Sequence, residues 1–598
     1  MSSLESQIVS IFEEKLFSIR SAEKGDRYYE CGRDELLKQL QGFIRENQRI
    51  QLLLPAFPCK SPNLEKVSGK LPDAGEVLAL EYLNNICREI SLLYEPGCDL
   101  KIWSDGGVFG DLIAVSEQDI ETYVRLLKYY SMTMSHIEWD CMNNYVNMKK
   151  GESLVGKYGS KSFSFEQWLL KSEDNRQQYV HLRRFIEKDL DNVDEYKKLS
   201  RRQIRERMKL VAEEMITRNE ALGNLLKEHY PNHIRLSIHQ HVNDGRKFTI
   251  RFFAQSHNSS ENSSILRTPW HNSFVINADG SPTMVPYRQL NLQSEHVPIM
   301  FKDQIWCFIQ LPQDAPPSLA SKVKLSFLGK SPRFGLSIDL NKEVDVSQLN
   351  ADWMKMLLQK FGLVVLRRCQ QSLDKDNYLH FCEQFGGPVM WNFGPLLSIK
   401  PAPEAASGHE SRELLPLHFD LSYPPEYLRK TGLYKDYVPQ YLMLYCLQAP
   451  LESHGGQTTF VNGRLLLESI KEKDILQWKT MDVSSITRKS FFGGQAYTYP
   501  MIMSHPQTNE DILRFLERSN TISQPIESQC SINGTIMDST DFEEFNHRMA
   551  KKLRDPNWYI EYTWNNDDLV LVENHLLLHG RTAINNETER ELWRVQVY

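Results

Sequence analysis

The first 150 residues show two different rhythms of apolar and polar positions. Apolar residues recur every three or four positions over residues 34–47 and 75–92, which predicts two helices. Residues 50–54 and 100–103 are short, nearly uninterrupted apolar runs, which predict buried strands. Helices and buried strands in alternation predict an α/β fold with a Rossmann-like layered, mainly parallel sheet.

Beyond these residues the pattern changes first to charged helices and then to strands. Residues 162–230 carry many charges at helical spacing, typical of solvated helices that cover a sheet or a site. From residue 234 the period becomes two, and Asp279-Gly280 predicts a hairpin turn. The polar residues 255–264 predict a surface loop. The segments with period two are IRLSIHQH (234–241), KFTIRFF (247–253) and SFVINADGSPTMV (273–285).

A boundary between two domains is predicted near residues 328–333, where the sequence LGKSPR brings Gly and Pro together. After it, a strand, a helix over residues 351–361 and a second strand begin a new unit. Beyond residue 388, strand patterns alternate with long irregular loops, which suits a double-stranded β-helix, or jelly-roll. We therefore expect two domains, 1–329 and 330–598, the second a jelly-roll with flanking helices.

Length, charge and cysteine content narrow the class of protein. A chain of 598 residues, 41% hydrophobic and 25% charged, is a soluble globular protein too long for one hydrophobic core. A net charge of −7 argues against nucleic-acid and anionic-membrane partners. The chain start lacks the layout of a signal peptide, and no apolar run approaches the roughly 18 residues of a membrane span. Ten scattered cysteines without a C-x-x-C pair predict reduced thiols in the cytoplasm.

Three residues of the second half have the chemistry of a metal site. His418 and Asp420 are two apart, so on a strand both side chains leave the same face. His579 follows the strongly apolar run 569–572 and a short loop. Two histidines and one carboxylate on one face leave positions open on the metal, as in non-heme Fe(II) oxygenases. About one His-x-Asp is expected by chance in a chain with 17 histidines, so the surrounding residues decide the interpretation.

Two arginines and a tight turn accompany the three metal-site residues. Arg590 lies 11 residues after His579 on the last predicted strand, and Arg594 lies four further on, on the same face. A guanidinium is always charged and grips a carboxylate with two parallel hydrogen bonds. The sequence Gly455-Gly456-Gln457-Thr458 predicts a tight turn that ends in a hydroxyl.

In this order, the segments LPLHFD, GGQTTF, DDLVLVENHLLLHGRT and RELWRVQV resemble the taurine/2-oxoglutarate dioxygenase family, over residues 334–598. The resemblance implies an enzyme that uses Fe(II), the cosubstrate 2-oxoglutarate and O2. It implies that Arg590, with help from Thr458, binds the distal carboxylate of 2-oxoglutarate, and that Arg594 holds an anionic substrate group. The implied Fe(II) ligands are His418, Asp420 and His579.

Other histidines near these motifs are predicted to be structural. His409, His454 and His575 lie off the register of the motifs and are interpreted as loop or packing residues. His136-Ile-Glu138 has the same spacing as His418 and Asp420, but it is predicted to lie in a helix without partner ligands.

Four segments of the first half are denser in polar, small and rigid residues than a core requires. Each segment also has a purely structural interpretation, as a turn, a strand-to-helix loop or a half-buried strand. Loops at strand ends of an open α/β sheet are nonetheless where ligands bind. The segments are PAFPCKSPN with KVSGKLPDAGE (55–76), SDGGVFGDL (104–112), IRLSIHQH (234–241) with Lys247, and TPWHNS (268–273). Their cations suit a phosphate, and their acids and imidazoles suit proton transfer: Lys60, Asp105, Asp111, Arg235, His239, Lys247 and His271.

In this order, the four segments resemble the isocyanide synthases of the pyoverdine/dityrosine biosynthesis family, over residues 32–312. The resemblance implies that the amino group of an L-amino acid becomes an isocyanide, with ribulose 5-phosphate donating the carbon. An imine between the amine and the sugar ketone would form first, followed by eliminations. We assign Lys60, Arg235 and Lys247 to binding phosphate or the substrate carboxylate. The candidates for proton transfer are Asp105, His239, Asp111 and His271.

The order of the two domains matches the order of two reactions. We therefore expect a bifunctional isocyanide (isonitrile) biosynthesis enzyme whose second domain oxidises the isocyanide, by desaturation with loss of the carboxylate or by hydroxylation. Two alternatives stay open: an oxygenase with a non-catalytic substrate-binding first half, and a non-catalytic iron or 2-oxoglutarate sensor. The sequence leaves open the amino acid, the oligomeric state and any channelling of the intermediate.

Overall fold

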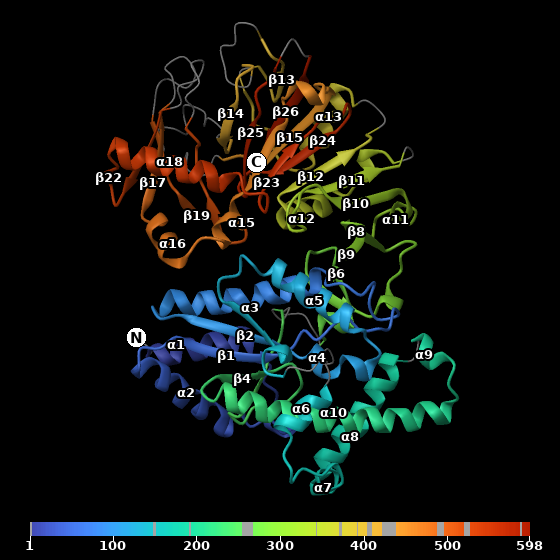
Figure 1. Ribbon diagram of the computed structural model, residues 1–598. Helices are drawn as coiled ribbons and strands as arrows, with labels where there is room; N and C mark the ends of the chain where they lie inside the picture. Colours follow the sequence, from blue (N-terminus) through green and yellow to red (C-terminus); the bar gives the residue numbers. More distant parts are fainter. Residues whose placement is uncertain are drawn as a thin grey trace. The chain divides into compact units, whose positions relative to one another are not determined.

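The chain forms two compact units, Met1–Val275 with Pro282–Leu290, and Ile276–Ser281 with Asn291–Tyr598. Each unit has its own hydrophobic core, and the computed structural model is shown in Figure 1. The structure describes residues 3–146, 151–190, 193–253, 267–341, 344–369, 373–391, 393–402, 410–420, 438–486, 496–518, 527–585 and 589–598.

The first unit is built on a five-stranded sheet in the order β3-β2-β1-β4-β5, in which all neighbours are parallel (Figure 1). A parallel sheet is therefore present, as predicted. Because β2 and β4 flank β1 on opposite sides, the strand order changes direction at β1. The strands are β1 (Ile50–Pro55), β2 (Cys98–Ser104), β3 (Ile137–Cys141), β4 (Ile234–Ser237) and β5 (Phe248–Thr249).

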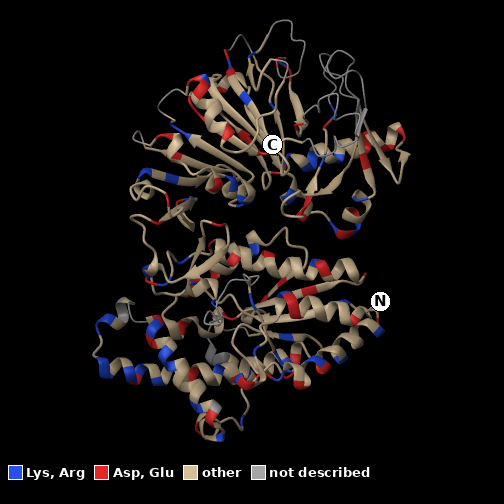
Figure 2. Ribbon diagram, turned by 180° about the vertical axis from the view of Figure 1, so that it is seen from behind, with Lys and Arg blue, Asp and Glu red and all other residues tan. Residues whose placement is uncertain are grey.

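Helices of the first unit include the two predicted from periodicity, α2 (Arg33–Arg45) and α3 (Ala74–Leu93). The predicted charged stretch forms α7 to α10, and positive and negative residues are interspersed along α10 (Figure 2). Helix α10 (Arg201–His229) begins with a capping box between Ser200 and Gln203. The other helices are α1 (Leu4–Ile11), α4 (Gly106–Phe109), α5 (Glu117–Tyr130), α6 (Gly151–Tyr158), α7 (Phe165–Lys171), α8 (Glu173–Leu190) and α9 (Asp194–Lys197).

Three local predictions need correction or comment. The segment around His136 is not helical, because Ile137–Cys141 pairs with β2 as strand β3. Strands β4 and β5 are shorter than the alternating pattern suggested, since the residues after Ser237 leave the sheet. The predicted loop 255–264 lies outside the described residues.

The second unit contains two large sheets that enclose one core. The hydrogen-bonded order in one runs β13-β26-β15-β24-β12-β11-β10-β8-β9, and the other runs β14-β25-β16-β23. Apolar residues of both sheets pack into this core, among them Leu444 and Val572 of the first and Phe460 and Leu578 of the second. Two layers of mainly antiparallel strands around one core form the predicted jelly-roll.

Its strands are β8 (His296–Phe301), β9 (Gln304–Gln310), β10 (Val323–Phe327), β11 (Leu336–Leu340), β12 (Leu363–Arg367), β13 (Leu396–Ile399), β14 (Leu415–His418), β15 (Tyr441–Gln448), β16 (Thr458–Asn462), β17 (Met481–Ile486), β18 (Ala496–Pro500), β19 (Ile502–Ser504), β20 (Asp511–Leu513), β21 (Glu527–Ile532), β22 (Thr535–Ile536), β23 (Tyr559–Tyr562), β24 (Leu569–Glu573), β25 (Leu577–Arg581) and β26 (Glu591–Val597). Its helices are α11 (Leu319–Lys322), α12 (Ala351–Phe361), α13 (Lys375–Glu383), α15 (Gly463–Glu468), α16 (Glu472–Trp478) and α18 (Ser539–Leu553). The predicted helix 351–361 matches α12.

The compact units divide the chain earlier than the predicted boundary at residue 330. Strand β10 pairs with β8 on one side and with β11 on the other, so the strands before residue 330 belong to the sheet of the second unit. Strands β6 (Ser273–Ile276) and β7 (Pro282–Val285) are joined by the predicted turn, with Gly280 at φ +80°. The functional division into 1–329 and 330–598 stays a prediction.

All ten cysteines are free thiols. Within the part of the chain that the structure describes, no helix combines the length and the apolar character that a membrane crossing requires.

Candidate functional site

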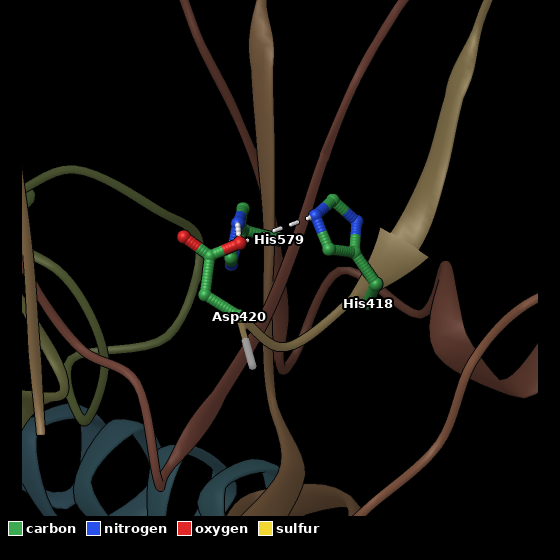
Figure 3. Close-up of side chains that lie close together, drawn as sticks. All are labelled: His418, Asp420 and His579. Carbon is green, nitrogen blue, oxygen red and sulfur yellow. Dashed lines mark ion pairs between the residues drawn. The ribbon is translucent and has the colours of Figure 1, made fainter. Parts of the chain in front are cut away.

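The predicted metal ligands of the second unit come together through strand pairing. Strands β14 and β25 are antiparallel, and His418 lies directly opposite His579 in their register. Figure 3 shows the two imidazoles and the carboxylate of Asp420 pointing toward one another. Asp420 Oδ1 is 3.6 Å from His418 Nε2 and 3.5 Å from His579 Nε2. The sequence-predicted triad is therefore a spatial cluster.

Backbone contacts orient two of these ligands. Nδ1 of His418 lies 2.7 Å from the carbonyl oxygen of Pro416, which can only accept, so Nδ1 carries the proton and Nε2 is free to bind a metal. The Asn574 side chain bonds both the N–H and the C=O of Asp420, each at 2.9 Å, and so fixes the backbone of that ligand. Asn574 follows strand β24 directly, and sequence reasoning did not single it out.

Charges around Asp420 keep it ionised. Burial alone would raise the pKa of this carboxyl, but Arg594, His579 and His418 together hold the pKa well below its ordinary value. Burial and the neighbouring His418 lower the pKa of His579, so its imidazole is neutral. A carboxylate and neutral imidazoles are the protonation states that metal ligation requires.

The donor set fits Fe(II). One ligand atom from each of His418, Asp420 and His579 can be chosen so that all lie within 4.8 Å of one another, and these three form the only such cluster among the described His, Cys, Asp and Glu residues. Two imidazoles and one carboxylate are the facial ligand set that leaves positions open on the metal.

Arg590 is a buried cation for which the described part of the chain supplies no acidic partner. Its side chain is 4% exposed, its Nε has no hydrogen-bond partner among the described residues, and Nη2 contacts Thr458 Oγ1 at 3.4 Å. Trp564 Nε1 donates to the same hydroxyl at 2.9 Å. Burial, reinforced by the nearby Arg581, lowers the pKa of Arg590 to about 9. An unpaired buried cation is costly, so this site requires an anion such as the distal carboxylate of 2-oxoglutarate.

Arg594 lies beside one of the metal-site residues, Asp420. It is half-buried, and its Nη1 is 3.6 Å from Asp420 Oδ2. Of the three histidines predicted to be loop or packing residues, the two that the structure describes do not join the metal cluster. His454 lies in the 3-10 turn Glu452–His454, and Nδ1 of His575 contacts the buried Arg514. His409 lies outside the described residues.

The first unit contains a cavity of about 90 Å³ at the carboxyl ends of strands β1, β2 and β4. This is where the strand order changes direction, the place where open α/β sheets bind ligands. Four of the predicted site residues lie here together, joined by residues of α10. The lining comprises Pro55, Asp105, Asn219, Leu222, Gly223, Leu226, Arg235, Leu236, Ser237, Ile238, His239 and Lys247.

Two opposite charges in this cavity are left unpaired. Asp105 Oδ1 and Arg235 Nε are both buried without a hydrogen-bond partner in the described part of the chain. Burial raises the pKa of Asp105 to about 7 and lowers the pKa of Arg235 to about 10. A carboxyl with a pKa near 7 can both accept and release a proton at neutral pH.

His239 and Lys247 are the other two predicted residues that line the cavity. Burial lowers the pKa of His239, and nearby Lys247 lowers it further, so the imidazole is neutral. Burial also lowers the pKa of Lys247, with Arg235 and Arg246 contributing. The cavity therefore offers two cations, one neutral imidazole and one carboxyl that titrates near neutrality.

The structure does not place Lys60 in this cavity. Its ammonium is buried and contacts Asp73 at 2.7 Å, Glu76 at 2.9 Å and the carbonyl of Pro269 at 3.0 Å. Three contacts use all three N–H donors of a lysine. In this arrangement Lys60 stabilises the loop before α3 and has no donor left for phosphate.

Asp111 and His271 are also engaged elsewhere. Asp111 pairs with the buried Arg218 at 2.7 and 3.1 Å. His271 lies in the 3-10 turn Pro269–His271, 3.8 Å from Asp189 Oδ2, and burial lowers its pKa to about 4. Asp189 lies at the end of α8 and also accepts a hydrogen bond from Ser61 at 2.6 Å. Sequence reasoning missed it, because it lies in a stretch that was interpreted as solvated charges.

Asn219 is the one polar residue that α10 contributes to the cavity. Sequence reasoning missed it. The available signal was its spacing from the apolar Leu222 and Leu226, which places all three on one helix face.

Comparisons with known proteins assign the two halves separately. Residues 40–297 match the family described as "Pyoverdine/dityrosine biosynthesis protein". Residues 323–596 match the "Taurine catabolism dioxygenase TauD, TfdA family".

Individual relatives agree with this division. "Isocyanide synthase A" of Aspergillus fumigatus is 25% identical over 99% of this chain and 97% of its own length. An "L-tryptophan isonitrile synthase" of Fischerella ambigua is 33% identical over 42% of this chain and 75% of its own length. A "Tyrosine isonitrile desaturase" of Pseudomonas aeruginosa is 28% identical over 45% of this chain and 89% of its own length.

Replacing Arg590 by Gln should weaken 2-oxoglutarate binding without loss of the metal. Two charge-assisted hydrogen bonds are removed, about 3 kcal/mol or roughly 100-fold in Kd. The measurement is anaerobic calorimetric titration of 2-oxoglutarate into Fe(II)-loaded protein. Arg548→Gln, at a residue with 62% side-chain exposure on α18, is the control and should leave Kd unchanged. An unchanged Kd for Arg590→Gln would contradict the assignment.

Replacing Asp105 by Asn should stabilise the protein increasingly as pH rises. Since folding raises the pKa of Asp105 from 3.8 to about 7, stability is lost as pH increases through this window, and Asn removes that loss. We expect the gain in unfolding free energy at pH 8 to exceed that at pH 5 by about 1–2 kcal/mol, discounted for partial exposure. Urea unfolding at both pH values measures it.

Asp111→Asn is the matched control for this prediction. The same substitution there removes one of the two acidic partners of the buried Arg218 and should lower stability at both pH values. A pH-independent effect of Asp105→Asn would show that its carboxyl is already ionised at pH 5.

Proposed function

Since the chain belongs to the pyoverdine/dityrosine biosynthesis family in its first half and to the TauD/TfdA dioxygenase family in its second, we propose that the two units catalyse consecutive reactions on one amino acid. The protein is a bifunctional enzyme of isonitrile biosynthesis that uses Fe(II), 2-oxoglutarate and O2. Its substrates are small molecules such as amino acids.

The first reaction in this proposal converts an L-amino acid and ribulose 5-phosphate to the amino-acid isocyanide. Arg235 and Lys247 bind the phosphate or the carboxylate, which supplies the anion that the unpaired Arg235 lacks. Asp105 and His239 transfer protons during imine formation and elimination, since both are neutral or close to their pKa at neutral pH. In this scheme the roles of Lys60, Asp111 and His271 are structural.

The second reaction oxidises the isocyanide in the jelly-roll. When bound, iron with 2-oxoglutarate and O2 supplies the oxidant that removes hydrogen from an unactivated C–H bond. Arg590 and Thr458 orient the cosubstrate, and Arg594 holds the substrate carboxylate beside Asp420. Positioning by Arg594 limits which hydrogen is within reach. The outcome is desaturation with release of the carboxylate as CO2, or hydroxylation.

One observation favours catalysis in both units over the alternatives. Each unit buries a cation that has no acidic partner among the described residues, Arg235 in the first and Arg590 in the second. A substrate-binding module needs no titrating carboxyl such as Asp105 beside its cation, and a sensor needs no second anion site such as Arg594.

The fold type of the first unit, the domain boundary and the cellular location belong to the same proposal. The strand order of the first unit supports a Rossmann-like layer, and the family matches support functional domains 1–329 and 330–598. Ten free thiols support a cytoplasmic location.

The proposal is tested with ribulose 5-phosphate labelled with carbon-13, a panel of L-amino acids, and the enzyme with or without Fe(II), 2-oxoglutarate and ascorbate. Mass spectrometry should detect a labelled isocyanide without iron. With iron, the product should either lose CO2 and two hydrogens or gain one oxygen. Failure to form labelled product from any amino acid would refute the synthase half.

Neighbouring residues provide a matched pair of variants for the same assay. Lys247→Gln should raise the KM for ribulose 5-phosphate by about 10–100-fold, since one charge-assisted contact is lost. Arg246→Gln should leave it unchanged, because that guanidinium is 78% exposed and pairs with Asp244. Equal effects of the two variants would exclude Lys247 from the anion site.

A further inference from the structure

The two oxygens of Asp420 have different surroundings. Oδ1 faces the two histidines, at 3.5 and 3.6 Å. Oδ2 accepts a hydrogen bond from Gln596 Nε2 at 2.7 Å and lies 3.6 Å from Arg594 Nη1. A carboxylate with one oxygen already hydrogen-bonded presents the other to a metal.

The orientation of the Gln596 amide is fixed by a tryptophan. Trp391 Nε1 lies 3.1 Å from Gln596 Oε1, and an indole N–H can only donate. The amide oxygen therefore faces Trp391, and the amide N–H₂ faces Asp420. Gln596 is 2% exposed, so water cannot replace either contact easily.

We propose that Trp391 and Gln596 act in series as positioning residues that make Asp420 bind the metal through Oδ1 alone. Gln596 occupies Oδ2, and Trp391 prevents the amide from turning its oxygen toward the carboxylate. Such contacts behind a metal ligand typically change metal affinity by 10- to 100-fold. Trp391 acts only through Gln596.

The test is a double-mutant cycle in which the Kd for Mn(II) is measured for each variant. The measurement is anaerobic calorimetry without cosubstrate. Gln596→Leu and Trp391→Phe should each weaken binding, by about 10- to 100-fold for the former and less for the latter. The double variant should bind like Gln596→Leu alone, because the proposal has Trp391 act through Gln596. The absorption spectrum of bound Co(II) should change more in Gln596→Leu and in the double variant than in Trp391→Phe.

Trp558→Phe is the matched control. It also removes an indole donor, to the carbonyl of Lys552 at 2.8 Å, but has no contact with Asp420. It should lower Tm and leave Kd unchanged. Additive effects of the two site variants, or an unchanged Kd for folded Gln596→Leu, would overturn the proposal. Gln596→Met serves where Leu prevents folding.

A second feature lies in the cavity of the first unit. Asn219, Leu222, Gly223 and Leu226 of α10 follow i, i+3, i+4 and i+7 spacing and form one wall. A Cβ built on Gly223 would meet no atom within 4 Å, so neither packing nor backbone conformation requires a glycine there. Glycine in a helix interior is destabilising, and Gly223 is an exposed residue at the edge of the cavity.

We infer that this wall receives the side chain of the amino-acid substrate and that Gly223 sets the size accepted. The inference rests on the proposed synthase reaction. The charged residues Arg235 and Lys247 line the same cavity, so the carboxylate or phosphate lies toward them and the apolar side chain lies against Leu222 and Leu226.

Substitution at Gly223 separates stability from selectivity. Gly223→Ala and the control Gly42→Ala, at an exposed α2 position with similar open space, should both raise Tm. Gly223→Leu should shift kcat/KM at least 10-fold toward amino acids with smaller side chains, and Gly42→Leu should not. An unchanged ranking in active Gly223→Leu would overturn the inference. A wild-type enzyme inactive on every amino acid would instead refute the proposed function.

Discussion

Antiparallel pairing of β14 with β25 is the constraint on which the oxygenase site depends. It places His418 opposite His579, and the chain then needs only two more residues to bring Asp420 to the same point. The last strand, β26, lies in the other sheet and directs Arg594 and Gln596 to the same carboxylate. Because the period of a strand is two, a slip of one residue in β26 would remove both contacts at once.

Unpaired buried charge distinguishes reactive groups from supporting ones in both units. Lys60 and Arg235 were both candidates for binding phosphate. Lys60 has three acceptors within 3.0 Å, whereas a buried N–H of Arg235 has no partner among the residues that the structure describes. The first arrangement is a completed ion-pair network, and the second is stable only with a ligand or at a cost in folding free energy. The same reasoning separates Arg590 from the well-paired Arg218.

Sequence reasoning succeeded where local periodicity carries the information. It predicted α12, the strand at residues 569–572 and the grouping of His418, Asp420 and His579, which do lie together. It could not tell Asp105 from Asp111, because both lie in one Gly-rich segment and only the fold shows which meets a buried arginine. Nor could it find Gln596 or Asn574, since an amide carries no charge pattern and its value depends on partners more than 150 residues away.

The hydrogen-bond donor to Asp420 Oδ2 is the neutral amide of Gln596, and this affects the charge of the metal site. A cation hydrogen-bonded to Oδ2 would offset more of the charge that Asp420 offers to a metal than an amide does, because the amide holds the oxygen without adding a charge of its own. Arg594 stands only 3.6 Å away, and in the proposed reaction it is shared between Asp420 and the carboxylate of the substrate. When a substrate carboxylate draws Arg594 toward itself, Gln596 keeps Oδ2 satisfied at 2.7 Å. Under the proposed roles the metal ligand keeps its geometry with and without substrate, because Gln596 holds Asp420 and Arg594 recognises the substrate.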